Sequence, residues 1–323
     1  RLGANEAPPA VVSMFLGDEL TAVLDAIEND KPYSGTEKTI MKLGVHILPK
    51  FARDNTDRNR TSPFAFTGNK FEFRMLGSSN SIACTNIMLN AAVAESLKIY
   101  ADRLENAEDF ETALHDMIKK TIKDHKRIIF NGNGYDDSWI KEATEKRGLL
   151  NLRTTPDALP KILDKKNVEM LTSLKVFTEA EIRSRYEITL ENYCKTVNIE
   201  ALTMVDMTKK EILPAIESYI KELSETASLK VEAVPGLTSK YESETISRLS
   251  LLSDEIYTAV CDLEKSLIEL KTASDITEES VMIRDVILNK MAALRVPCDE
   301  AETLTAEKYW PFPTYGELLF GVK

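Results

Sequence analysis

Two short stretches between residues 55 and 80 carry charged side chains at spacings that suit chemistry. Lys70, Glu72 and Arg74 alternate with Phe71 and Phe73, and an alternation of period two is typical of a half-buried β-strand. If the phenylalanines face the core, the charged side chains project from the other face, about 6.6 Å apart along the strand. A carboxylate held between two cations on a rigid strand suits a metal ion beside an anionic substrate.

The second stretch lies just before this strand. Residues 58–60 read Arg-Asn-Arg and are followed by Thr61-Ser62-Pro63, so they form a polar, cationic loop. From the pattern alone, the strand also has a plain interpretation. It is then an ordinary solvated strand face on which neighbouring charges pair with one another, and such faces are common.

Composition limits the class of protein. The chain has 323 residues and a formal net charge of −11, which predicts about two domains with an ample core. An acidic balance argues against general binding to nucleic acid or to an anionic membrane, because both need clustered cations. No apolar run is long enough to span a membrane.

Four cysteines lie far apart in the sequence and form no CxxC pair: Cys84, Cys194, Cys261 and Cys298. This spacing indicates neither a zinc site nor a disulfide framework. Isolated cysteines in helical patterns usually behave as small core residues. We therefore expect a cytoplasmic protein in a reducing compartment.

The first 106 residues predict strands and helices in mixed order. We expect a short buried strand at 10–16, a helix from Gly17 to Asn29, a polar loop at 29–39 and a further strand at 44–51. After the charged strand, a long helix runs from about Ser81 to Glu105. Its first half is apolar and rich in small residues, which suits burial against a sheet.

From residue 106 onward the pattern changes to helix after helix. A stripe at steps of three and four follows one long helix and is close to an antiparallel coiled coil: Ile246, Leu249, Leu252 or Ser253, Ile256, Val260, Leu263, Leu267 and Leu270. Pro214 should kink or interrupt the helix that contains it. A final helix is expected over 276–294.

Two further segments of this region have no regular pattern. The glycine-asparagine loop NGNGY, ending at Tyr135, predicts a structural turn rather than a phosphate cradle, because no GK[ST] follows it. The tail YWPFPTYGELLF is too short and too rich in proline to form a strand with a hydrophobic core of its own. We expect it to dock on a surface of the same subunit or of a neighbour.

Several of these motifs together resemble one enzyme family. Asn59-Arg60-Thr61-Ser62, followed by Lys70-x-Glu72-x-Arg74, is similar to the Asn-Arg-Ser loop and (Arg/Lys)-x-Glu-x-Arg strand of glutamine synthetases. The opening residues 1–8 (RLGANEAP) resemble the flap of that family, Arg-Leu-x-x-x-x-Glu-Ala-Pro, shorter by one residue. The segments RLGANEAPPAVVSMFLG, FTGNKFEFRMLGSSNS and WPFPTYGELLF resemble the type III branch, the long bacterial form.

The resemblance implies an α+β fold in two parts. Residues 1–106 would be the C-terminal part of the catalytic domain, a sheet with packed helices. Residues 107–323 would be the large, all-helical domain of the type III branch. Because the chain opens at Arg1, inside what resembles an active-site flap, we expect the C-terminal portion of a longer protein, inactive without its N-terminal part.

The resemblance also implies a reaction and its reactants. Glutamate, ammonium and ATP would be the substrates, glutamine the product, and γ-glutamyl phosphate the intermediate. Phosphoryl transfer needs divalent metal ions and cations on the transferring group. Carboxylate ligands suit Mg²⁺ or Mn²⁺. The family further implies a large homo-oligomer.

Residue roles follow from the matched positions. The resemblance makes Glu72 a metal ligand and gives Arg60 a catalytic contact with the transferring phosphate of the nucleotide. Arg74 would hold glutamate or stabilise developing charge. Lys70 would contact the nucleotide, and it stands where the family commonly has arginine, so it keeps the charge but loses the bidentate geometry.

The flap supplies the last two candidate residues. Arg1 matches the flap arginine that contacts the substrate carboxylate. Glu6 matches the flap glutamate, which closes over the ammonium site and accepts a proton. One family feature is missing, because no second arginine follows Arg60 within residues 61–66. The role of that arginine is lost, moved to another position, or taken by Arg58.

Two other functions remain open from the sequence. A related ATP-dependent γ-glutamyl ligase that uses an amine other than ammonia would share the flap and the strand. A helical scaffold that retains half of an old catalytic sheet would share the helical region. The charges at Glu6, Arg60, Glu72 and Arg74 argue against the scaffold, which gains nothing from them.

Overall fold

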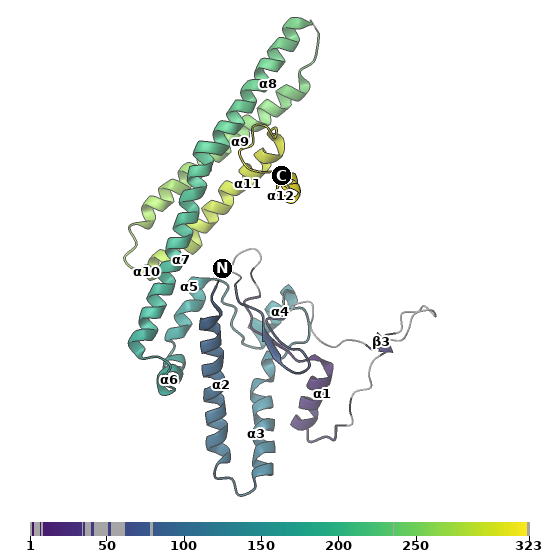
Figure 1. Cartoon of the computed structure of the whole chain (residues 1–323), viewed down its shortest axis with the longest axis vertical. Helices are drawn as coiled ribbons and strands as arrows, with labels where there is room; N and C mark the ends of the chain where they lie inside the picture. The colour runs from purple at the N-terminus through teal and green to yellow at the C-terminus, as the bar shows by residue number, and fades with distance from the viewer. Residues whose placement is uncertain are drawn as a thin grey trace. The chain divides into compact units, whose positions relative to one another are not determined.

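The computed structural model describes residues 2, 7, 9–33, 35, 40–41, 51–52, 62–77, 80–234 and 236–321. The chain divides into two compact units, residues 1–183 and 184–323, and the division falls inside helix α7 (Glu179–Met207). The fold is mostly helical with a small sheet (Figure 1), in line with the expected mixture of strands and helices. The domain boundary predicted at 106/107 stays a prediction.

A three-stranded sheet in the first unit contains the charged strand. Its order is β1 (Met14–Phe15), β4 (Phe64–Phe66) and β5 (Phe71–Phe73). β1 runs parallel to β4, and β4 runs antiparallel to β5. The strand predicted at 10–16 is therefore confirmed only for Met14 and Phe15, near its C-terminal end.

A second, two-stranded pair is formed by β2 (Ile40–Met41) and β3 (Phe51–Ala52). The strand predicted at 44–51 lies outside the described residues except for Phe51.

The expected alternation in β5 is confirmed, but the expected orientation of Phe71 toward the core is wrong. Phe64 pairs with Phe73 and Phe66 with Phe71, so all four rings lie on one face of the sheet. Phe71 is 45% exposed, and its ring stacks on Phe64 with centroids 5.6 Å apart. On the opposite face, Ala65 is fully buried. The rings thus pack mainly on one another.

Several helices of the first unit precede α7 along the chain. They are α1 (Gly17–Glu28), α2 (Ile82–Leu104), α3 (Phe110–His125), η1 (Lys126–Ile128), α4 (Asp137–Lys141), η2 (Glu142–Lys146), α5 (Thr155–Ala158), η3 (Leu159–Leu163) and α6 (Lys165–Ser173). α1 and α2 confirm the two predicted helices. Figure 1 shows α2 and α3 as a hairpin. The N-cap of α2 is Ser81, whose hydroxyl accepts a hydrogen bond from the Ala83 N–H.

The expectation that the first half of α2 is buried is wrong. Ala91 is its one buried residue, and Ile82, Val93 and Cys84 are exposed. The reason is geometric, because the helix contacts α3 and α6 and so uses only part of its circumference. Most residues of this segment are small or apolar, so composition alone overstates its burial.

The second unit is a helical bundle. Besides most of α7 it contains η4 (Thr208–Ile212), α8 (Leu213–Ala233), α9 (Lys240–Leu270), α10 (Ile276–Met282), η5 (Ile283–Ile287), α11 (Leu288–Leu304) and α12 (Tyr315–Phe320). Figure 1 shows α8 and α9 side by side. The predicted stripe on α9 is confirmed, since Leu249, Leu252, Ile256, Val260, Leu263, Leu267 and Leu270 are all buried. Leu252, not Ser253, occupies the buried position.

Two prolines act differently from one another in this bundle. Before Pro214 the helix widens into the π-turn η4, and the proline then stands in the first turn of α8. The hydrogen-bond pattern changes before Pro214, because a proline cannot donate the helical hydrogen bond, but the backbone stays helical from Glu179 to Ala233, so the helix is not interrupted. Pro297 is buried inside α11, which continues to Leu304, so the helix end predicted at 294 is wrong.

All four cysteines are free. Cys194 and Cys298 are buried as expected, and burial raises the pKa of the Cys194 thiol to about 12 and that of Cys298 to about 11. Cys261 is half-buried and Cys84 is exposed, so Cys84 is not the core residue that was expected. Within the described part of the chain, no helix combines the length and apolar character needed to cross a membrane.

Candidate functional site

Lys70, Glu72 and Arg74 form a row of charges along β5. The Lys70 ammonium lies 3.3 Å from Glu72 Oε1. The Arg74 guanidinium donates to Glu72 Oε2 from Nη2 at 3.0 Å and from Nε at 3.3 Å. Side-chain exposure falls along the row, from 65% for Lys70 to 37% for Glu72 and 14% for Arg74.

The β4–β5 hairpin holds this row in place. The Thr67 N–H donates to the Lys70 carbonyl at 2.9 Å and closes the turn. Gly68 has φ +97°, a left-handed conformation that glycine adopts without strain. After the last residue of β5, the Arg74 N–H donates to the Pro63 carbonyl at 2.7 Å. The backbone of the row is therefore hydrogen-bonded at both ends.

The two cations keep Glu72 ionised. The hydrogen bonds from Arg74, and then the contact with Lys70, hold the pKa of the Glu72 carboxyl below its usual value. A depressed pKa suits a metal ligand, since a carboxylate must be deprotonated to bind a cation. It equally suits a structural ion pair on a solvated strand, which the sequence left as the plain interpretation.

Glu72 offers a hard oxygen ligand of the kind that Mg²⁺ and Mn²⁺ prefer. Among the residues that the structure describes, no group of three or more histidine, cysteine, aspartate or glutamate side chains comes together. Glu72 therefore fits as a single ligand whose orientation Arg74 sets, and a complete site needs carboxylates from elsewhere.

The other predicted site residues cannot be placed beside this row. Arg1, Glu6 and Arg60 lie outside the described residues. Of the Asn-Arg-Thr-Ser loop, the described part begins at Ser62, which is buried just before β4. The structure thus brings together three of the six predicted site residues, and all three belong to one hairpin.

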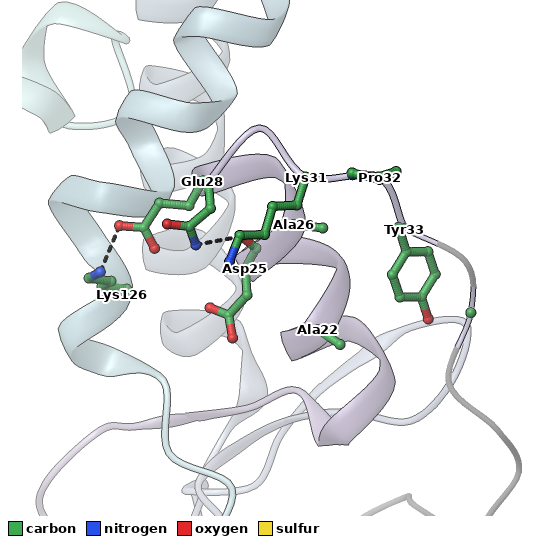
Figure 2. A pocket seen from close by; sticks show the side chains of 10 residues that line it. Ala22, Asp25, Ala26, Glu28, Lys31, Pro32, Tyr33 and Lys126 are labelled. Atoms are coloured by element: carbon green, nitrogen blue, oxygen red, sulfur yellow. Dashed lines mark hydrogen bonds and ion pairs between the residues drawn. The ribbon is translucent and has the colours of Figure 1, made fainter.

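A separate hollow of about 620 Å³ lies between the end of α1 and η1 (Figure 2). Glu28 Oε1 and Lys126 Nζ pair across it at 2.6 Å, and Asn29 Nδ2 donates to the Asp25 carbonyl at 2.7 Å. Its acidic and basic groups are present in equal number: Asp25 and Glu28, Lys31 and Lys126. The hollow contains none of the predicted site residues and is no extension of the β5 site.

One residue next to the sheet was not predicted from the sequence. Asn131, in the NGNGY loop, accepts hydrogen bonds from the N–H groups of Leu16 and Gly17 through its side chain, each at 3.0 Å. The prediction of a structural turn rather than a phosphate cradle agrees with this contact. An asparagine followed by a glycine signals a turn, but no local pattern predicts its contact with Leu16, 115 residues earlier in the chain.

Comparison with known proteins places these features in one family. Residues 113–231 match the family model described as the glutamine synthetase C-terminal domain. The whole chain aligns with the glutamine synthetase of Butyrivibrio fibrisolvens at 39% identity over 329 aligned positions. This chain belongs to the glutamine synthetase family. A type-3 glutamine synthetase from Dictyostelium discoideum, 36% identical over 99% of the chain, agrees with the resemblance to the type III branch.

The relatives are longer than this chain. A glutamine synthetase from Bacteroides fragilis is 35% identical over 99% of the chain. The chain spans 46%, 44% and 45% of the lengths of these three relatives. The family model matched at 113–231 covers α3 to α8 in part, whereas the Lys70–Glu72–Arg74 row lies before it.

Proposed function

We propose that this chain is the C-terminal portion of an ATP-dependent glutamate–ammonia ligase of the type III branch. The observation that carries the proposal is the ionised Glu72 carboxylate between Lys70 and Arg74, in a chain that aligns along its whole length with glutamine synthetases. The β5 row would form one wall of the active site.

In the proposed reaction, the glutamate γ-carboxylate attacks the γ-phosphate of ATP and ADP leaves. Ammonia then attacks the acyl carbon of γ-glutamyl phosphate, phosphate leaves with the bonding electrons, and a proton is removed from the nitrogen. Both steps gather negative charge on phosphate oxygens, which fixed cations stabilise.

Glu72 would hold a divalent ion, Mg²⁺ or Mn²⁺, which when bound neutralises phosphate charge. Arg74 would support this ligand, because its guanidinium donates hydrogen bonds to the Glu72 carboxylate and so orients it. Groups that orient a ligand in this way commonly tune the ligand as well. Arg74 would also hold glutamate, and the more exposed Lys70 would contact the nucleotide.

The three remaining residues complete the proposed site by analogy with the family. Arg60 would contact the transferring phosphate, and Arg1 the substrate carboxylate. Glu6 would close over the ammonium ion, attract it by charge and accept its proton. Closure of a loop over an acyl phosphate also excludes water, which would otherwise hydrolyse it.

The four free cysteines favour a reducing compartment such as the cytoplasm.

The tail supports a proposal about assembly. Its first half docks in the same chain, where Tyr309, Trp310 and Phe312 pack on the core of the second unit. The Tyr309 hydroxyl donates to Glu222, and its ring lies 5.5 Å from that of Tyr219. In α12, by contrast, Tyr315 is 83% and Phe320 is 81% exposed. We propose that these exposed apolar side chains of α12 are buried in the contact with a neighbouring subunit of a homo-oligomer.

The first prediction is that residues 1–323 alone make no glutamine. Glu72 is one metal ligand, and the carboxylates for a complete site are not gathered in the described part of the chain. We expect no phosphate release dependent on glutamate and ATP, measured on the purified chain. Addition of the remaining half of a full-length relative is the positive control, and robust turnover by the chain alone would overturn the proposal of a partial enzyme.

The second prediction concerns Glu6 in the complete enzyme. Glu6→Ala should raise the ammonium concentration needed for half-maximal rate and slow amide formation, while ATP binding stays nearly normal because Lys70, Glu72 and Arg74 are unchanged. Side-by-side titrations of ammonium and ATP measure the difference, and a panel of other amines tests for the related γ-glutamyl ligase. A shift in ATP affinity with unchanged ammonium dependence would show that Glu6 has another role.

The third prediction concerns the tail. Deleting residues 315–323 should lower the mass of the oligomer in light scattering and leave the thermal midpoint of the helical unit unchanged. Deleting 309–323 should also lower the midpoint, because it removes the contacts of Tyr309, Trp310 and Phe312. An unchanged mass in both deletions would exclude the tail from assembly.

A further inference from the structure

Asn131 uses all of its side-chain polar atoms on one helix start. Its Oδ1 accepts from the Leu16 and Gly17 N–H groups, each at 3.0 Å, and its Nδ2 donates to Thr21 Oγ1 at 2.9 Å. The cap position of α1 is Leu16, which has no side chain able to cap. Asn131 therefore performs the N-cap task from a distant part of the chain, satisfying amides that would otherwise be unpaired.

The backbone beside Asn131 continues the sheet. The Phe130 N–H donates to the Met14 carbonyl at 2.9 Å, and Met14 forms a parallel bridge with Ile129. The lateral order is thus Ile129, β1, β4, β5. Core packing holds residues 129–131 in place. The Phe130 ring stacks on the buried Trp139 at a centroid distance of 3.8 Å, and both residues pack in a cluster with Val11.

Strand register connects this anchor to Glu72. Phe15 is the partner of Ala65 in β4, and Ala65 is the partner of Glu72 in β5. β1 is only two residues long, so few ladder hydrogen bonds define its position. A slip of one residue in such a strand moves its side chains to the other face of the sheet. The Asn131 contacts begin at Leu16, directly after Phe15.

We propose that Asn131 is a positioning residue that fixes β1 against β4 and thereby holds Glu72 in the geometry needed for metal binding. The proposal rests on the proposed function of Glu72 as a metal ligand. It assigns a role in the active site to the loop that separates α3 from α4, more than fifty residues after the charged strand.

The test replaces Asn131 in the complete enzyme and measures Mn²⁺ binding with the metal alone, by electron paramagnetic resonance. Asn131→Ala should weaken Mn²⁺ binding roughly tenfold, the lower end of the range for residues that support metal ligands. It should also increase amide hydrogen exchange at Leu16 and Gly17. Asn131→Asp keeps the acceptor oxygen and should restore most of the affinity and the protection.

Asn133 provides the matched control in the same loop. Its side chain is also exposed but accepts only a local hydrogen bond, from the Tyr135 N–H at 3.0 Å. Asn133→Ala should leave Mn²⁺ affinity unchanged. If Asn131→Ala fails to fold, Thr21→Val gives a milder loss, because it removes only the hydroxyl that Asn131 Nδ2 contacts, and it should weaken Mn²⁺ binding in the same direction.

The outcomes separate the two proposals. Increased exchange at Leu16 and Gly17 with wild-type Mn²⁺ affinity overturns the positioning role and leaves Asn131 as a helix cap. Equal losses in Asn131→Ala and Asn133→Ala overturn it as well. Glu72→Gln is measured in parallel: if it lowers Mn²⁺ affinity while the Asn131 variants do not, only the inference fails. If Glu72→Gln leaves Mn²⁺ affinity unchanged, the proposed function fails and the inference with it.

Discussion

Glu72→Gln should abolish most of the glutamine-forming activity of the complete enzyme while the fold survives. The amide keeps the shape of the side chain but removes the charge that binds a hard divalent cation. Loss of the ligand should weaken metal affinity at least as much as loss of a residue that supports a ligand, which costs roughly 10- to 100-fold. Turnover as a function of Mg²⁺ and Mn²⁺ concentration measures the effect, and circular dichroism verifies the fold.

Glu142→Gln is a matched control for this substitution. Glu142 also pairs with an arginine, since its Oε1 lies 2.6 Å from Arg147 Nη2, and it is exposed to a similar extent as Glu72. It lies outside the proposed site, so its removal should leave metal dependence unchanged. Near-wild-type turnover of Glu72→Gln would mean that Lys70, Glu72 and Arg74 form the ordinary solvated strand face.

The pKa of Glu72 determines the pH range in which the ionisation of Glu72 affects stability and metal binding. Arg74, followed by Lys70, lowers the pKa of the folded carboxyl. The stabilisation from these contacts is therefore present above the unfolded pKa and is lost as pH falls through the lowered folded value. Titrations of metal binding near neutral pH report on other groups, because Glu72 stays ionised there.

Leu263→Ala should strongly destabilise the helical unit. Leu263 is completely buried in the stripe of α9 that packs in the core of the second unit. Deleting a leucine side chain from a core leaves a cavity and lowers the free energy of unfolding by about 2–5 kcal/mol. Thermal unfolding followed by circular dichroism measures the shift of the midpoint.

Leu251→Ala is the control on the same helix. Leu251 is 57% exposed, so its truncation should change the free energy of unfolding by less than about 0.5 kcal/mol. Equal shifts in the midpoint for the two variants would contradict the assignment of the buried face of α9.

Local patterns in the sequence determined much of the architecture. The apolar stripe of α9 predicts its buried face because side chains three and four residues apart share one side of a helix. The charged alternation in β5 predicts that Glu72 lies beside Lys70 and Arg74, since strand geometry alone fixes that spacing. The sequence also indicated the family, because the motifs that carry the resemblance are short and contiguous in the chain.

Other features were decided only by tertiary structure. Whether Phe71 is buried depends on what packs over its face, and whether Ile82 in α2 is exposed depends on which helices reach it. Both are long-range properties that composition does not encode. The bond from Asn131 to the Leu16 N–H joins groups 115 residues apart, and only the folding of the chain between them brings these two groups into contact.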